Sequence, residues 1–136
     1  MKKYICILAL LPVALLTLLL FSCTQAQATD PASVMKALFN AVNQGKADVA
    51  TNYFAEYAAI ISPWGQPSGT KKIHDWFAVV LIPTKTQLKI GEFSVDGVNL
   101  TGTFKITGLG FHDEPFKVMA VIQDGKIKSM TWTGAK

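Results

Sequence analysis

Cysteine is scarce in this 136-residue sequence, which contains only Cys6 and Cys23. Both precede Asp30, where the first helix signal begins, so the roughly 107 residues that follow contain no thiol. A disulfide and a cysteine metal site are therefore excluded from that part of the chain. Its stability has to come from a buried apolar core, and a chain of this length is long enough to form one.

Arginine is absent: all 13 basic residues are lysine, against nine acidic residues. Lys2 and Lys3 belong to the N-terminal segment, and without them the net charge falls from +4 to +2. No basic run is longer than Lys71-Lys72, and bidentate recognition of phosphate or guanine favours arginine. The sequence also lacks a glycine-rich phosphate loop that opens a helix and a nucleophile elbow. We therefore predict no nucleic-acid partner.

A single long apolar run extends from Tyr4 to Phe21 and follows Lys2 and Lys3. This arrangement is typical of an export signal, which we place at residues 1–22. The run is also about long enough to span a membrane as an uncleaved anchor. The small polar residues behind it favour cleavage.

Two processing sites overlap after this run. The segment 19–23, LLFSC, resembles a bacterial lipobox, in which Cys23 is lipidated and becomes the first residue of a membrane-anchored lipoprotein. Residues 23–29 would then be a short tether, and the domain would face the periplasm or the cell exterior. The alternative is an A-x-A site at residues 26–28, which would release a soluble periplasmic or secreted chain that begins at Thr29. We favour lipidation because a small residue directly precedes Cys23, whose thiol has no structural role in so polar a segment.

The rest of the chain, residues 30–136, is predicted to be one domain with helices first and strands afterwards. Asp30-Pro31 is typical of a helix start and Gly45 of a helix end. We expect further helices at about 47–56 and from Thr70 to Pro83, a loop at 63–69, and five strands with three turns between the last four. The strands are expected at 58–62, 88–95, 100–111, 116–123 and 127–133, with an irregularity near 91–92 and turns at 96–97, 112–115 and 124–125.

This order predicts an α+β fold in which three N-terminal helices pack on a strongly curved antiparallel sheet, giving a cone-shaped half-barrel. The strand at 116–123 is apolar on both faces, since Phe116, Val118, Ala120 and Ile122 alternate with a second set that includes Met119 and Val121. One face can pack on the helices, and the other requires a cover. We therefore expect a homodimer through the outer face of the sheet.

Several segments together resemble the nuclear transport factor 2-like superfamily, which includes SnoaL-like polyketide cyclases and ketosteroid isomerases. They are NQG at 43–45, YFAE at 53–56, AIISP at 59–63, IHDWF at 73–77 and DGKIKSM at 124–130. The resemblance covers most of residues 31–133. It implies a cone-shaped α+β fold, a small-molecule pocket and frequent homodimers.

The resemblance also allows the isomerase catalytic positions to be compared. The carboxylate base of the isomerases matches Ser62, their two oxyanion donors match Leu38 and Met119, and a supporting tyrosine matches Phe77. Serine cannot take a proton from carbon without an activating base, and the other three side chains are apolar. Steroid-isomerase chemistry is therefore excluded, and we predict no catalytic residue, metal or cofactor.

Two function classes remain open from the sequence, and a structural dimer whose cavity is filled is a third possibility. The favoured one is a binding module for a small hydrophobic ligand, with a pocket whose expected lining is Leu38, Tyr57, Ser62, Trp64, Trp76, Phe77, Met119 and Trp132. The alternative is a SnoaL-like isomerase, cyclase or hydrolase with a non-standard acid–base set around Ser62, His74 or Tyr57. His112-Asp113-Glu114 resembles a metal or acid–base cluster but is expected in an exposed turn, and two histidines without a third ligand make a poor zinc signal.

Lipidation of Cys23 can be tested directly. We expect wild-type protein to fractionate with membranes, and Cys23→Ala to release it or to stall its processing because the lipid acceptor is gone. Cys6→Ala, a matched change inside the apolar run, should behave as wild type. Cell fractionation with N-terminal sequencing measures both properties, and a mature chain that begins at Thr29 would refute lipidation.

Overall fold

The structure, a computed structural model, describes residues 30–135. The export signal and Cys23 lie outside the described residues. The helical elements are α2 (Pro31–Asn43), α3 (Ala47–Thr51), α4 (Thr70–Trp76) and the π-helix η2 (Phe77–Leu81). The strands are β1 (Phe54–Ile61), β2 (Gln87–Asp96), β3 (Asn99–Gly108), β4 (Phe111–Gln123) and β5 (Lys126–Gly134). Within the described part of the chain, no helix has the length and apolarity needed to cross a membrane.

Helix α2 begins and ends where the sequence predicts. Asp30 is the N-cap residue and Pro31 is the first helical residue, but the Asp30 carboxylate accepts a hydrogen bond from the Ser33 hydroxyl instead of capping the backbone. Gly45, with a φ of 74°, ends the helix, since glycine adopts this left-handed conformation without strain. The N–H of Lys46 then reaches back to the carbonyl of Ala41.

The second predicted helix, at 47–56, is too long. Helix α3 ends at Thr51, and the chain is already a strand at Phe54, four residues earlier than expected. Tyr53 and Phe54 suit a helix and a strand equally well by their apolarity. Pairing with β5 decides the matter, because Phe54 lies opposite Ile127 and the Ile127 N–H donates to the Tyr53 carbonyl.

The third predicted helix forms over the expected residues, but its second half is wider than an α-helix. After α4, the π-helix η2 is closed by a hydrogen bond from the Ile82 N–H to the Phe77 carbonyl. This local widening leaves Phe77 and Leu81 fully buried and Val79 71% exposed.

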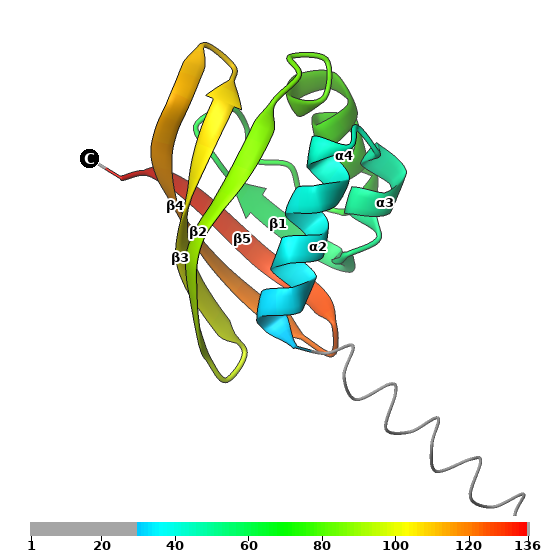
Figure 1. Cartoon of the computed structure of the whole chain (residues 1–136). Helices are drawn as coiled ribbons and strands as arrows, with labels where there is room; N and C mark the ends of the chain where they lie inside the picture. The colour runs from blue at the N-terminus through cyan, green and yellow to red at the C-terminus, as the bar shows by residue number, and fades with distance from the viewer. Residues whose placement is uncertain (1–29, 136) are drawn as a thin grey trace, which may run out of the picture.

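The five strands form one curved, open sheet in the order β1-β5-β4-β3-β2, and the helices lie along one side of it (Figure 1). The expectation of a purely antiparallel sheet is wrong at one edge, where β1 pairs with β5 in parallel. Strand pairings between β2, β3, β4 and β5 are antiparallel, as expected. The predicted irregularity near Gly91 is confirmed as a register shift between Ile90 and Phe93.

The predicted turn at 112–115 is wrong, because β4 already begins at Phe111. The chain turns instead at Leu109 and Gly110, whose φ angles are 56° and 84°. Gly108, with a φ of 113°, also departs from extended geometry, so the glycines around Leu109 make this the easier place to reverse the chain. His112-Asp113-Glu114 consequently lies on a strand.

Helix α2 is tied to strand β2 by a side chain that imitates a strand partner. The Asn43 amide donates to the Leu88 carbonyl at 2.9 Å, and its oxygen accepts the Leu88 N–H at 2.7 Å. Because β2 is an edge strand, these two backbone groups have no neighbouring strand on that side. The half-buried Asn43 therefore closes the edge of the sheet against the end of α2.

Removing this clamp should destabilise the fold. We expect Asn43→Ala to lower the free energy of unfolding by about 1–3 kcal/mol, because two part-buried backbone groups lose their partner. Asn40→Ala, an exposed change on the same helix, should alter it by less than about 0.5 kcal/mol. Urea denaturation followed by circular dichroism measures both, and equal effects from the two variants would contradict the role given to Asn43.

Candidate functional site

Six of the eight predicted pocket residues lie in the interior between the helices and the concave side of the sheet. Five are buried and Trp64 is half-buried against the core. They come from α2, the loop after β1, α4, η2 and β5. The six are Leu38, Ser62, Trp64, Trp76, Phe77 and Trp132.

The centre of this interior is an aromatic cluster around Trp132. Its indole meets the rings of Phe104 at 5.1 Å, Trp76 at 5.7 Å, Phe39 at 6.1 Å and Trp64 at 6.5 Å between ring centroids. These spacings and their tilted or edge-to-face angles are typical of attractive ring contacts. The cluster occupies the region in which the sequence predicts a cavity.

Sequence reasoning missed part of this cluster. Phe39 and Phe116 are buried, and Phe111 is half-buried; Phe111 and Phe116 both contact the Trp64 ring. A signal for two of them was present, since Phe39 follows Met35 at helical spacing and Phe116 begins the alternating apolar set on β4. The sequence did not indicate which face of each strand points inward.

Two of the predicted pocket residues do not face the interior. Met119 is 55% exposed on the outer face of β4, because Val118 and Ala120 on either side of it point into the core. Tyr57 is 86% exposed on β1, where Ala58 is the buried neighbour. Alternation along a strand allows only one of two adjacent residues inside, so the expected inward orientation of both residues is wrong.

Ser62 is held by its own turn. Its hydroxyl donates to the Gly65 carbonyl at 2.9 Å and accepts the Trp64 N–H at 3.1 Å. The backbones of Ser62 and Gly65 also exchange two hydrogen bonds, of 3.0 and 3.3 Å. The hydroxyl therefore fixes the loop that carries Trp64, and no histidine or carboxylate accompanies it to make it a nucleophile.

In the part of the chain that the structure describes, the interior contains no buried titratable side chain. Among residues 30–135, the only buried polar side chains are Ser62 and Thr86, and the Thr86 hydroxyl pairs with that of Thr84 at 2.7 Å. The same residues contain no group of three metal-ligating side chains placed to hold a metal ion. General acid–base chemistry needs a titratable group within hydrogen-bond reach of the substrate, which this interior does not supply.

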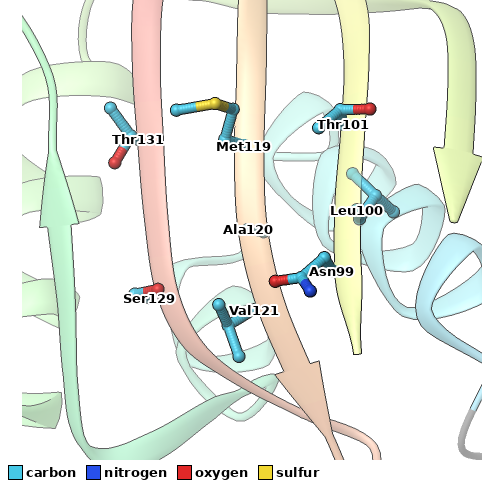
Figure 2. A pocket seen from close by; sticks show the side chains of 8 residues that line it. All are labelled: Asn99, Leu100, Thr101, Met119, Ala120, Val121, Ser129 and Thr131. Atoms are coloured by element: carbon cyan, nitrogen blue, oxygen red, sulfur yellow. The ribbon is translucent and has the colours of Figure 1, made fainter. Parts of the chain in front are cut away.

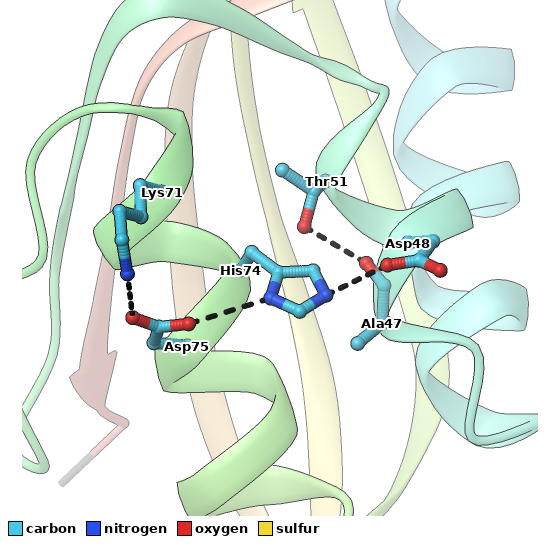
Figure 3. A network of polar contacts seen from close by, with 6 residues as sticks. All are labelled: Ala47, Asp48, Thr51, Lys71, His74 and Asp75. Carbon is cyan, nitrogen blue, oxygen red and sulfur yellow. Dashed lines mark hydrogen bonds and ion pairs between the residues drawn. The ribbon is translucent and has the colours of Figure 1, made fainter.

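A histidine–carboxylate contact does occur, but on the outside of the helical layer. Figure 3 shows His74 of α4 between two carboxylates: Nε2 is hydrogen-bonded to Asp48 of α3 at 2.7 Å, and Nδ1 lies 3.5 Å from Asp75. Lys71 donates a hydrogen bond to Asp75 at 3.1 Å. This hydrogen bond is the larger cause of a lowered pKa at Asp75, and the hydrogen bond with His74 is the next. The network is solvent-exposed and links α3 to α4.

Three hollows lie away from the aromatic interior. One of about 380 Å³ is formed on the outer face of β3, β4 and β5 (Figure 2) by Asn99, Leu100, Thr101, Met119, Ala120, Val121, Ser129 and Thr131. Two others, of about 310 and 290 Å³, lie at the Gly91 irregularity and between the end of α2 and the loop before β2. None of these three is lined by the six interior residues.

Known proteins resemble this chain in structure but not closely in sequence. No family model and no curated protein matches the sequence. An NTF2-like protein of unknown function from Cytophaga hutchinsonii superposes with a TM-score of 0.67 at 13% identity, over 77% of this chain and 89% of its own. The fold is that of the nuclear transport factor 2-like superfamily.

Two further structures with this fold show the range of its relatives. A candidate SnoaL-like polyketide cyclase from Jannaschia gives a TM-score of 0.64 at 17% identity, over 77% of this chain and 85% of its own. A protein with a ketosteroid isomerase-like fold from Catenulispora acidiphila, solved with trimethylamine, gives 0.64 at 15% identity, over 73% and 82%. Identities this low establish the shared fold, and function has to be argued from the site.

Proposed function

We propose that this chain is an exported, lipid-anchored NTF2-like domain that binds a small hydrophobic molecule among its interior aromatic side chains and does not transform it. One observation carries the proposal: the interior of a fold that often encloses a small-molecule site is walled here by apolar and aromatic groups, with no buried titratable side chain among residues 30–135. Such a surface favours an apolar ligand and offers no proton donor or acceptor for turnover.

The isomerase positions support binding over catalysis. Leu38 and Phe77 are fully buried and apolar, and Ser62 is committed to its own turn. Met119 faces outward, so the fourth position contributes nothing to the interior. The nearest resemblance to a catalytic pair, His74 with Asp48, is exposed on the helical side.

A ligand would enter the interior by passing the side chain of Trp64. It lies on the loop between Ser62 and Gly65, is half-buried, and covers Trp132 and Phe116. The backbone of this loop is fixed by hydrogen bonds within one turn. We infer that rotation of the Trp64 side chain, and not movement of the loop, would admit the ligand.

Ligand binding can be tested with tetralin, an uncharged bicyclic hydrocarbon, and by native mass spectrometry of the protein purified from its host. We expect a retained small molecule or, after its removal, tetralin binding seen in tryptophan fluorescence. Trp64→Ala should weaken tetralin binding by about 1–3 kcal/mol through lost contact area. Val79→Ala, an exposed change on η2, should leave it unchanged.

Absence of both the retained molecule and tetralin binding would refute the proposal. A turnover lost on Ser62→Ala or His74→Ala would establish the SnoaL-like enzyme instead.

The outer face of the sheet supports a second part of the proposal, a homodimer. Strand pairing aligns Ile61, Thr131, Met119 and Thr101 in one row across β1, β5, β4 and β3. The hollow in Figure 2 is lined by apolar, hydroxyl and amide side chains and by no charged residue. Interface cores are depleted of charge, and Lys105 and Lys117 stand at the margin of this row, where a polar rim is expected. A second copy of the same uncharged face is the partner that it fits.

A charge at the centre of this face should disrupt the dimer. We expect wild-type protein to sediment as a dimer whose interface buries about 1,000 Å² or more. Met119→Glu should convert it to a monomer, because two carboxylates would be buried near the two-fold axis. Val79→Glu, the same change at an exposed apolar residue of η2, should remain dimeric. Analytical ultracentrifugation distinguishes these states, and a monomeric wild type would refute the dimer.

A further inference from the structure

The hollow beside the Gly91 irregularity carries two lysines. Its volume of about 310 Å³ is at the lower end of the range, about 300–1,000 Å³, that is typical of small-molecule sites. Three neighbouring strands form it, and its lining residues are Lys89, Ile90, Gly91, Thr103, Phe104, Lys105 and Pro115. None of the eight predicted pocket residues is among them, so this hollow is separate from the aromatic interior.

Strand pairing places the two lysines and a proline in one row on the outer face of the sheet. Lys89 of β2 lies opposite Lys105 of β3, which in turn lies opposite Pro115 of β4. Leu88 and Phe104, which precede the two lysines along their strands, are buried in the core, so both lysines point to the opposite face. Their aliphatic stems and the proline ring provide apolar surface, and their ammonium groups provide positive charge beside it.

The two lysines of this row are only partly neutralised. Like charges that face each other across paired strands repel, so the row costs the free domain some stability. The Asp113 carboxylate offsets part of the charge through a half-exposed ion pair with Lys105 Nζ at 3.6 Å. Among residues 30–135, no carboxylate forms an ion pair with Lys89. The row therefore retains one positive charge, which matches a ligand with one negative charge.

The Gly91 irregularity brings a hydroxyl group to the same hollow. A Cβ added at residue 91 would lie 2.8 Å from the Thr103 carbonyl oxygen, so the close approach of the two strands requires glycine here. The Thr103 hydroxyl accepts the Glu92 N–H at 3.2 Å and retains its own proton for donation to an anion. Glu92 of β2 and Lys117 of β4 lie on the strands either side of Thr103, and their opposite charges leave the balance of the hollow unchanged.

We propose that this hollow on the outer face of β2, β3 and β4 is a second binding site, which takes a small organic monoanion with an apolar body, such as an aromatic carboxylate. Lys89 and Lys105 hold the carboxylate, the Thr103 hydroxyl donates a hydrogen bond to it, and the lysine stems with Pro115 contact the apolar body. The repulsion between the lysines then becomes attraction to a common partner. A phosphate monoester carries nearly two charges and is better matched by arginine, which the chain lacks.

The test compares 2-naphthoate with 2-naphthamide, a neutral probe of nearly the same shape, using the full chain in a non-ionic detergent. We expect naphthoate to bind about tenfold more tightly, because only its carboxylate gains charge-assisted hydrogen bonds from the lysines. Raising the salt concentration from about 0.05 M to about 0.5 M should remove most of this preference, since exposed charges are screened. In ¹H–¹⁵N spectra, naphthoate should shift the backbone amide signals of Gly91, Thr103 and Lys105.

Variants assign the preference to the lysine row. Lys89→Gln and Lys105→Gln should each lose most of the preference for naphthoate, whereas Lys128→Gln, at an exposed lysine of β5, should keep it. Lys89→Gln should leave the melting temperature unchanged or raise it, because it removes a repulsion and no ion pair. This second readout separates a binding role from a structural one, and a preference that survives both lysine variants refutes the site.

The remaining outcomes distinguish this site from the interior one. Equal affinity for naphthoate and naphthamide refutes the anion site and leaves the interior, which tetralin tests, standing. Naphthoate shifts confined to interior signals such as that of the Trp132 indole also refute it. Binding to vesicles of phosphatidylglycerol and phosphatidylcholine without binding of naphthoate would replace the site with a membrane contact. Loss of tetralin binding alone refutes the interior function and leaves the anion site standing.

Discussion

Packing around Trp132 is the interaction on which the rest of the structure depends. Its indole is contributed by β5, which lies between β1 and β4 in the sheet, and touches rings from α2, the Ser62–Gly65 turn, α4 and β3. No other buried side chain in the described part of the chain has so many aromatic partners. A curved sheet can hold helices on its concave side only if bulky groups fill the space beneath them, and these rings do so. No cysteine follows Asp30, so no disulfide can stabilise this domain and the packing has to do so.

The same packing sets the chemical character of the interior. In the part of the chain that the structure describes, this interior is lined by apolar and aromatic side chains and contains no buried titratable group, which is the basis of the proposed binding function. The buried Nε1–H groups of Trp76 and Trp132 are the exception to that uniformity, since neither has a hydrogen-bond partner among residues 30–135. They introduce polarity without introducing charge.

Alternation along the strands gives the sheet two different faces. On β4, Phe116, Val118, Ala120 and Ile122 enter the core, whereas Met119 and Val121 face out over the hollow in Figure 2. A purely solvated outer face would carry charged or polar residues at these two positions. Apolar side chains there, with lysines only at the margin, are consistent with the proposed second copy.

The sequence by itself determined the fold class, the start and end of α2 and the irregularity at Gly91. These depend on local signals: capping residues, glycine and apolar period. Only the tertiary structure decided three further matters. The end of α3 and the early start of β1 depend on pairing of Phe54 with Ile127, a residue more than 70 positions away. The outward orientation of Met119 depends on which face of β4 meets the helices, which two largely apolar faces leave undecided. The unpartnered state of the Trp76 and Trp132 donors depends on every neighbour brought to them by the fold, because hydrogen-bond satisfaction is a property of three-dimensional surroundings and not of sequence.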